Sequence, residues 1–465
     1  MTTNDICWMS AIDLAKAIKR RKISPVEVIK TFLERIESIN PTVNAYVTVT
    51  ADSALAEAQR AEKAVMKGEE LGPLHGVPVS VKDLIFTKGV RTTLGCKLLE
   101  DLVPEEDATN VARLKKAGAI LLGKTNTSEF GFKPLTDNLL FGATRNPWNL
   151  DKTSGGSSGG AAAAVASGLG PLAVGADGGG SIRIPSSCCG VFGIKPQLGR
   201  VPRYPAIPGG EFIFHEGPIT RTVRDAAVML DVMAGFHWGD GYSFPSPKAK
   251  FTKSIGAGVK GLTIAWSPDL GYAIVDPQVN EICARAAKEF SKLGAQVEEA
   301  QPGFANPEIH IGTICGADAL EALSALGPVD QIIDKLAPLT SAMLFVSSEL
   351  KATDYAKAMF AKQELTIKMG KFFQTYDLLL TPTLPTPPLP VEFDDPIGFL
   401  RWVAFLFPFN LTGQPAASVP AGWTDDGLPV GLQIVGRPFD EATVLRAAAT
   451  FEAAHPWTQR KPSLG

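Results

Sequence analysis

Charge of one sign is not in excess in this chain of 465 residues. Its 45 basic and 48 acidic residues leave a formal net charge of −3. Proteins that attract nucleic acid or an anionic membrane surface carry an excess of basic residues. We therefore expect neither nucleic acid nor a membrane as a partner, and a small molecule instead. Residues 1–10 are polar and lack the apolar run of a signal peptide, so we expect a cytoplasmic protein.

Cysteine is also sparse, and no two cysteines have metal-binding spacing. The absence of a C-x-x-C pair favours reduced thiols over a disulfide framework or a zinc site. The six cysteines are Cys7, Cys96, Cys188, Cys189, Cys283 and Cys315. No glycine-rich loop has the pattern of a phosphate-binding or dinucleotide-binding loop. The sequence predicts neither a metal nor a cofactor.

A long apolar run without helix breakers is missing too. Residues 153–176 contain no charge, and hydropathy alone favours a membrane span there. The seven glycines and Pro171 in this segment indicate instead a loop, a tightly packed helix and a buried strand.

The chain does contain alternating helix and strand patterns. This alternation favours an α/β fold in which helices cover both faces of a sheet. Ser24 and Pro25 are typical of the N-cap and first residue of a helix. We expect helices at 11–20, 25–39, 52–67, 110–117, 161–167, 222–234 and 277–293, strands at 77–81, 120–122, 172–174, 262–266 and 378–380, and long connections at 207–214 and 381–390.

The densest chemical signal is a pair of glycine-rich loops that contain serine. Residues 155–160 read Gly-Gly-Ser-Ser-Gly-Gly, and residues 177–183 read Asp-Gly-Gly-Gly-Ser-Ile-Arg. Glycine permits positive φ and close approach of the backbone, and successive exposed N–H groups form an anion-binding nest. Such a nest beside a serine hydroxyl can stabilise the oxyanion of an acyl-transfer reaction.

A serine nucleophile needs a base, and histidine is scarce. Residues 155–159 formally satisfy the nucleophile elbow G-x-S-x-G, which requires a downstream acid and histidine. His455 has a suitable chain order, but no motif surrounds it, and we expect structural or surface roles for all five histidines. They are His75, His215, His237, His310 and His455. A lysine can replace histidine, and Lys82, which follows an apolar strand pattern that would bury and neutralise it, is the candidate.

Three motifs and their spacing resemble the amidase signature family. Lys82 lies in Val-Lys-Asp, 75 residues before Ser157, and Ser181 lies 24 residues after Ser157. Further similar segments occur at 74–78, 123–126, 193–196 and 427–433, so the resemblance covers nearly the whole chain. It implies one domain over 1–465 with a mixed, twisted β-sheet. Its parts are N-terminal helices at about 6–68, a catalytic core at about 72–235, and a substrate-shaping half at about 236–465.

The resemblance also assigns roles to residues. It implies that Ser181 attacks the carbonyl to form an acyl-enzyme, that Ser157, in a cis peptide, relays the proton, and that neutral Lys82 accepts it. The backbone N–H groups of Gly178, Gly179, Gly180 and Ser181 would hold the oxyanion.

Three residues flank these glycines. For Asp177 and Arg183 we favour a supporting ion pair or hydrogen bonds over direct chemistry. Ala176 stands where the family often has threonine or serine, so one hydroxyl is absent but no catalytic residue is.

Three functions are weighed: a free-standing amidase, the glutaminase subunit of a tRNA-dependent amidotransferase, and a catalytically silent interaction protein. The intact triad argues against the last. The glutaminase subfamily grips glutamine with an arginine and an acid in its C-terminal half. Here residues 328–350 contain no arginine, and Val403 stands where the acid is expected. The free-standing amidase is therefore preferred.

The substrate class rests on apolar residues. The aromatic segment 399–409, which contains Trp402, either packs in the core or forms a cleft for aryl and alkyl groups. Gly131, followed by Phe132, matches a position that lines the family's acyl pocket. We expect a hydrolase, monomeric or homodimeric, that acts on carbon–nitrogen bonds other than peptide bonds. Its expected substrates are small hydrophobic or aryl amides, and also esters or carbamates (urethanes).

Overall fold

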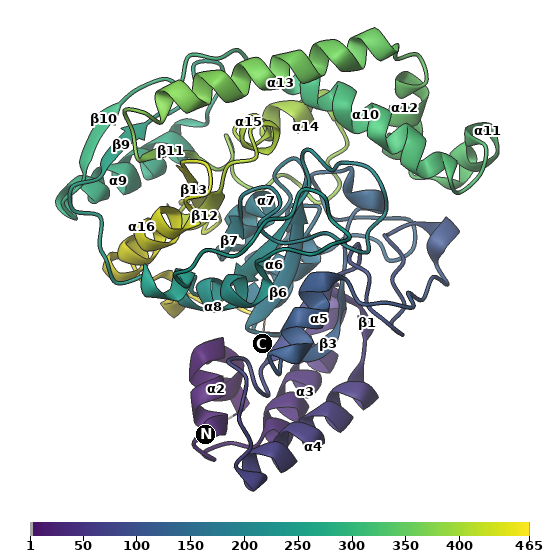
Figure 1. The fold of residues 1–465 in the computed structure, drawn as a ribbon, viewed down its shortest axis with the longest axis vertical. Helices are drawn as coiled ribbons and strands as arrows, with labels where there is room; N and C mark the ends of the chain where they lie inside the picture. Colours follow the sequence, from purple (N-terminus) through teal and green to yellow (C-terminus); the bar gives the residue numbers. More distant parts are fainter. Residues whose placement is uncertain (1–2, 465) are drawn as a thin grey trace.

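The computed structural model describes residues 3–464. Within them a mixed sheet of eleven strands runs in the order β1-β3-β2-β6-β8-β7-β12-β13-β11-β9-β10 (Figure 1). Its strands are β1 (Tyr46–Val49), β2 (Pro78–Lys82), β3 (Ile120–Thr125), β6 (Leu172–Asp177), β7 (Phe192–Lys195), β8 (His215–Thr220), β9 (Thr263–Trp266), β10 (Gln296–Glu299), β11 (Leu378–Pro382), β12 (Ala416–Trp423) and β13 (Pro429–Gly436). A separate hairpin is formed by β4 (Arg145–Asn146) and β5 (Asn149–Thr153).

The helices surround this sheet. In chain order they are α1 (Thr3–Trp8), α2 (Ala11–Lys19), α3 (Pro25–Val43), α4 (Ala51–Lys67), α5 (Thr109–Lys116), α6 (Gly159–Ala166), α7 (Arg183–Cys189), α8 (Val223–Met233), α9 (Pro277–Lys292), α10 (Glu308–Ser324), α11 (Val329–Ile332), α12 (Pro338–Ser347), α13 (Ala352–Phe372), α14 (Pro396–Trp402), α15 (Phe407–Leu411) and α16 (Glu441–Ala454).

Helices cover both faces of the sheet, as the alternating pattern predicts. On β13, Gln433 accepts a hydrogen bond from Arg183 of α7, whereas a Cβ on Gly436 would lie 2.6 Å from Val444 of α16. Residues three positions apart on a strand point to opposite faces, so α7 and α16 lie on opposite sides. α6 packs against α7, and α8 packs against α16.

The strands that carry the two glycine loops lie at the centre of the sheet. β2 pairs in parallel with both β3 and β6, and β6 pairs antiparallel with β8. Lys82 is the last residue of β2 and Asp177 the last residue of β6. Because parallel strands end at the same edge, Lys82 and the loop after Asp177 meet there.

The expected helices and parallel strands are confirmed, with ends that differ by a few residues. Ser24 caps α3 by accepting a hydrogen bond from the Val26 N–H at 3.0 Å. The antiparallel strands β7, β8, β12 and β13 were not predicted. All eight residues of β13 are buried, so its sequence shows no alternation of apolar and polar residues.

The helices α10 to α13 were also not predicted. Figure 1 shows them together at one end of the molecule, above the strands. Several of their apolar side chains face outward, including Ile309 and Phe360, which are 70% and 72% exposed. This exposure obscures the one-sided apolar pattern by which an amphipathic helix is recognised.

Within residues 3–464, no single helix has both the length and the apolar character required to cross a membrane. α10 and the segment Val329–Lys335 reach that threshold only as a pair, with a bend of 83° between them.

Candidate active site

The amine of Lys82 lies under the first glycine loop. Its Nζ donates a hydrogen bond to Ser157 Oγ at 2.7 Å and a longer one to the carbonyl oxygen of Ala176 at 3.4 Å. The side chain of Lys82 has no exposed surface. Lys82 and Ser157, which the sequence places 75 residues apart, are therefore in direct contact.

Burial determines the charge state of Lys82. Removal from water lowers the pKa of this amine to about 7, although the nearby carboxylates of Asp177 and Glu216 oppose the shift. About half of the molecules therefore carry a neutral Lys82 at pH 7. A neutral amine can accept a proton from a serine hydroxyl.

The backbone of the first loop is tightly enclosed. The Gly156–Ser157 peptide bond is cis, as the resemblance implied. A Cβ on Gly156 would lie 2.3 Å from the carbonyl carbon of Leu135, so no other residue fits. Thr136 Oγ1 donates hydrogen bonds to the carbonyl oxygens of Gly155 and Ser157, at 2.9 and 3.2 Å. These contacts hold the Ser157 hydroxyl above Lys82.

Ser181 lies between β6 and α7, in the second loop. It is 8% exposed and lines an internal cavity. The N–H of Ser158 donates to the Ser181 carbonyl oxygen at 3.2 Å, which joins the two loops. Ser181 is thus the member of the triad that faces the cavity.

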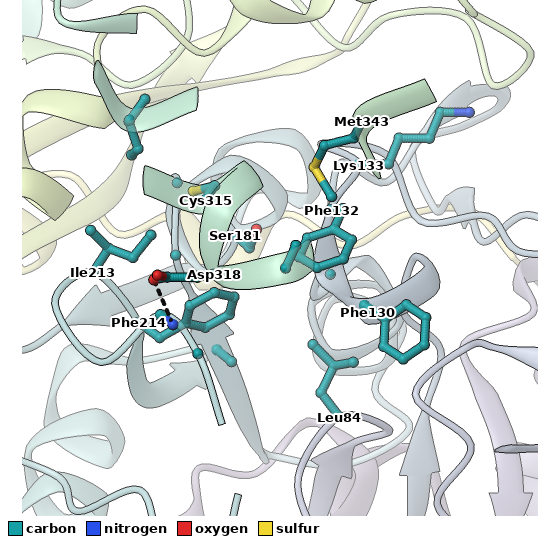
Figure 2. A pocket seen from close by; sticks show the side chains of 18 of the residues that line it. Leu84, Phe130, Phe132, Lys133, Ser181, Ile213, Phe214, Cys315, Asp318 and Met343 are labelled. Carbon is teal, nitrogen blue, oxygen red and sulfur yellow. Dashed lines mark hydrogen bonds between the residues drawn. The ribbon is translucent and has the colours of Figure 1, made fainter. Parts of the chain in front are cut away.

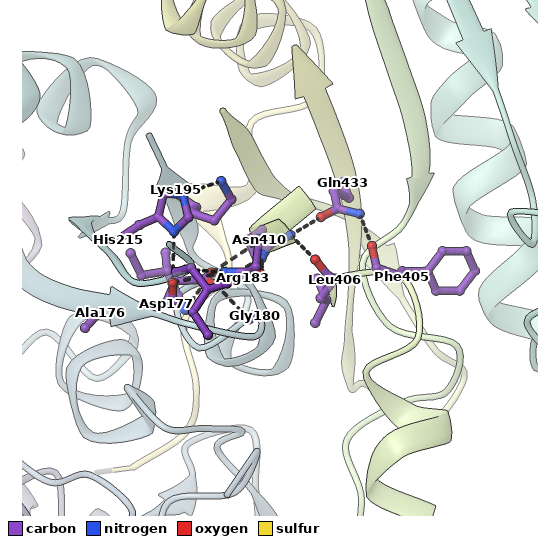
Figure 3. A network of polar contacts seen from close by, with 12 residues as sticks. Ala176, Asp177, Gly180, Arg183, Lys195, His215, Phe405, Leu406, Asn410 and Gln433 are labelled. Atoms are coloured by element: carbon purple, nitrogen blue, oxygen red, sulfur yellow. Dashed lines mark hydrogen bonds and ion pairs between the residues drawn. The ribbon is translucent and has the colours of Figure 1, made fainter. Parts of the chain in front are cut away.

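An ion pair supports the second loop from behind (Figure 3). Arg183 donates to both carboxylate oxygens of Asp177, at 2.9 and 3.0 Å, and neither side chain is exposed. Arg183 also donates to Gln433 and Asn410. Burial opposes the charge of Asp177, but the Arg183 guanidinium holds the pKa of this carboxyl well below its usual range.

The carboxylate of Asp177 also takes up backbone N–H groups of the loop. The Gly180 N–H donates to Asp177 Oδ1 at 2.7 Å, and the Ile182 N–H donates to Oδ2 at 3.2 Å. Of the four amides expected to face an oxyanion, the Gly180 amide is therefore already engaged. Gly178, Gly179 and Ser181 retain the geometry of a nest.

Histidine contributes no base to this site. His215 is buried, with Nδ1 3.2 Å from the Asp177 carbonyl oxygen and Nε2 3.2 Å from Lys195 Nζ (Figure 3). Burial, together with the neighbouring Lys195, lowers the pKa of His215 well below its usual value. His455, the candidate of the elbow alternative, lies on the surface with Nε2 3.3 Å from Glu289.

The cavity over Ser181 has a volume of about 390 Å³ and a mainly apolar lining. Gly131 and Phe132 both line it, as expected, and Figure 2 shows Phe132 and Met343 near Ser181. A Cβ on Gly131 would lie 3.1 Å from Ser157 Oγ. The small size of Gly131 therefore keeps the space beside the Ser157 hydroxyl open.

The expectation for Trp402 is wrong. Trp402 is 2% exposed and is not part of the cavity lining, because it packs into the core. Four neighbours from the same aromatic segment line the cavity instead, namely Phe399, Leu400, Val403 and Phe407. A helical segment turns successive side chains by about 100°, so the cluster was located correctly but its inward member was not.

Comparisons with known proteins place this chain in a family. The sequence profile described as Amidase matches residues 27–445. This chain belongs to the amidase signature family. An acylamidase of Rhodococcus erythropolis is 40% identical over 100% of this chain and 99% of its own length. A glutamyl-tRNA(Gln) amidotransferase subunit of Geotalea daltonii is 37% identical over 97% and 98%, respectively.

The fold agrees with that membership. The crystal structure of a bacterial aryl acylamidase of the same family superimposes with a TM-score of 0.91 at 34% identity, covering 97% of each chain. The amidase described here is thus a single-domain α/β hydrolase that acts on carbon–nitrogen bonds other than peptide bonds.

Sequence reasoning missed several residues of the amidase cavity. Glu216 of β8 and Phe214 line it, and a Cβ on Gly178 would lie 2.8 Å from the Phe214 ring. Asp318 and Cys315 reach it from α10. No local motif marks these positions, since they meet Ser181 only through the antiparallel pairing of β8 and the placement of α10.

Metal binding has no obvious place in the part of the chain that the structure describes. No group of three or more His, Cys, Asp or Glu side chains is arranged to hold a metal ion there.

Proposed function

We propose that this amidase cleaves small hydrophobic or aryl amides through Ser181, Ser157 and Lys82. The contact between Lys82 Nζ and Ser157 Oγ, with Ser181 at the cavity, is the observation that supports this mechanism most strongly. In the first half-reaction Ser181 Oγ attacks the carbonyl carbon, and its proton passes through Ser157 to neutral Lys82. Lys82 then returns the proton through Ser157 to the leaving nitrogen, and the free amine departs.

The second half-reaction uses the same groups. Water attacks the acyl-enzyme while Lys82, neutral again, accepts its proton through Ser157, and the Ser181 oxygen recovers a proton as the carboxylic acid leaves. The N–H groups of Gly178, Gly179 and Ser181 stabilise the oxyanion in both steps. The Gly180 amide orients the loop through Asp177 rather than facing the oxyanion.

The substrate class follows from the cavity lining. Phe130, Phe132, Met343, Phe399 and Leu400 offer apolar surface to an aryl or alkyl group. The relatives named acylamidase and aryl acylamidase support the same class. Esters and carbamates fit the same attack on a carbonyl carbon, and a carbamate would release an alcohol, CO2 and an amine.

The glutaminase alternative has less support. Glutamine would require a charged grip in the C-terminal half, and Val403, buried in the cavity wall, is apolar. Measurable hydrolysis of glutamine by the purified protein would favour this alternative over our proposal.

A substrate panel tests the proposal. We expect turnover of p-nitroanilides and acetanilides, with weaker or comparable turnover of p-nitrophenyl esters and aryl carbamates. Ser181→Ala should abolish every activity, and a fluorophosphonate probe should label the wild-type protein at Ser181. Activity in the Ser181→Ala protein, or labelling of another serine, would overturn the mechanism.

A further inference from the structure

Glu216 places a carboxyl group in the wall of an otherwise mainly apolar cavity. It lies on β8, is only 6% exposed, and lines the cavity that Ser181 faces. Buried carboxylates in proteins are normally paired or fully hydrogen-bonded, because an unpaired one is costly to remove from water. The partners of Glu216 therefore indicate whether its role is purely structural.

Glu216 has one fixed partner. Asn110 Nδ2 of α5 donates a hydrogen bond to Oε2. Among residues 3–464, no side chain or backbone N–H donates to Oε1, and no cation lies within 4 Å of the carboxyl group. Burial raises the pKa of Glu216 to about 7, a shift that Arg203, Lys82 and Lys124 oppose and Asp240 reinforces.

Arg203 lies near this carboxyl without pairing with it. It also lines the cavity, but its guanidinium sits 5.0 Å from the centre of the Phe214 ring. Its backbone N–H is held by Asp240. The cavity therefore has a polar end, formed by Arg203 and Glu216, in which one carboxyl oxygen has room for a donor.

The strand register places Glu216 on the Lys82 side of the nucleophile. Glu216 is directly opposite Ala176 in the antiparallel pair of β8 and β6. Directly opposed side chains point to the same face, and both residues line the cavity. The carbonyl oxygen of Ala176 accepts the 3.4 Å hydrogen bond from Lys82. The small Ala176 side chain leaves space in front of the carboxyl group.

The proposed mechanism determines which part of the substrate lies on this side. Lys82 and Ser157 return a proton to the leaving nitrogen, so the amine half of the amide must lie toward them. The free oxygen of Glu216 is then available to a group carried by that amine half.

We propose that Glu216 is a specificity residue that accepts a hydrogen bond from an ammonium or N–H group on the amine half of the substrate. The preferred substrates are amides of diamines, such as N-acylated aryl diamines, rather than amides of purely hydrocarbon amines. This inference rests on the proposed function, because that mechanism orients the amine half toward Lys82.

Binding of matched product amines tests this assignment without requiring turnover. In the Ser181→Ala protein at pH 8.5, the dissociation constants of 3- and 4-(aminomethyl)aniline are compared with those of 3- and 4-ethylaniline by calorimetry. The two amines of each pair have nearly the same shape and differ in the ammonium group. We expect at least one aminomethyl isomer to bind at least 10-fold more tightly than its ethyl counterpart.

The variant Glu216→Gln, made in the same background, removes the charge and keeps an oxygen for Asn110. We expect it to abolish this preference and to change the affinity for the ethyl compounds less than twofold. Glu452→Gln is the matched control, because Glu452 is a largely buried glutamate outside the cavity lining whose pKa burial also raises to about 7. It should retain the preference.

Two outcomes would overturn the assignment. One is the absence of a preference in the parent protein, and the other is an equal loss of affinity for both compounds in Glu216→Gln, as expected if the residue only anchors α5. If Glu216→Gln does not fold, Glu216→Asp is judged by the same ratio. Turnover of the acetanilides by wild-type protein is measured separately, so a failure of the proposed function appears there and not in the binding ratio.

Discussion

The floor and the wall of the cavity are built in different ways. The floor consists of Lys82, Ser157, Asp177, Ser181 and Arg183, and its polar side chains form hydrogen bonds or ion pairs of 2.6–3.4 Å. The wall consists of the cavity-lining residues of α10, α12 and α14, including Cys315, Met343 and Phe399, which meet the cavity mainly through apolar contacts.

This difference separates reaction from substrate choice. Directional bonds between fully buried groups fix positions closely, so a change in the floor alters the chemical step. Apolar contacts are non-directional, so a change in the wall alters which groups fit. We expect variants of the floor to lower kcat and variants of the wall to raise KM.

The largest effect is expected when Lys82 is replaced. Lys82→Ala and Lys82→Met should both lower kcat/KM by about 10³- to 10⁴-fold, because both remove the base that accepts the Ser157 proton. Methionine fills most of the lysine volume, so Lys82→Met separates loss of the base from loss of packing. Steady-state kinetics and thermal unfolding check this. A Lys82→Met protein with more than a tenth of wild-type activity would exclude Lys82 as the base.

A smaller effect is expected where wall and floor meet. Gly131→Ala places a Cβ 2.9 Å from Leu84 and 3.1 Å from Ser157 Oγ, and should lower kcat by about 10- to 100-fold through displacement of the proton relay. Gly142→Ala is the matched control. Gly142 has φ +72°, close to the +79° of Gly131, but open space around it. Equal losses of activity in the two variants would assign the effect to backbone strain.

The pH profile tests the floor without a mutation. Because neutral Lys82 is the active form and burial lowers its pKa to about 7, kcat/KM should rise about tenfold from pH 6 to pH 8 and then level off. In Glu216→Gln the inflection should move to lower pH, because the Glu216 carboxylate raises the pKa of Lys82. A profile that still rises steeply above pH 9 would contradict a depressed lysine pKa.

The smallest effect on activity is expected for the wall alone. Phe399→Ala should raise KM for arylalkyl amides about fivefold with little change in kcat, since loss of about 1 kcal/mol of apolar contact corresponds to that factor. Trp402→Ala should leave KM nearly unchanged but lower the free energy of unfolding by about 3–5 kcal/mol, because Trp402 packs in the core. The reverse pattern would assign Trp402 to the site.

The floor could be predicted from the sequence because its residues occur in dense local motifs. The loops at 155–160 and 177–183 contain glycines whose replacement would clash with fixed backbone, as at Gly156 beside Leu135. The helices and parallel strands around them follow local apolar patterns. The wall carries no such motif, and its helices α10 and α12 expose apolar side chains such as Ile309 and Phe345.

The sequence by itself determined the family, the α/β class and the identity of the serines and the lysine. The tertiary structure alone decided that Lys82 Nζ touches Ser157, that the Gly180 amide is committed to Asp177, and that Phe399 rather than Trp402 faces the cavity. It also brought Glu216 opposite Ala176. The physical reason is that motifs record local backbone requirements, whereas burial and strand register arise from contacts between segments far apart in the chain.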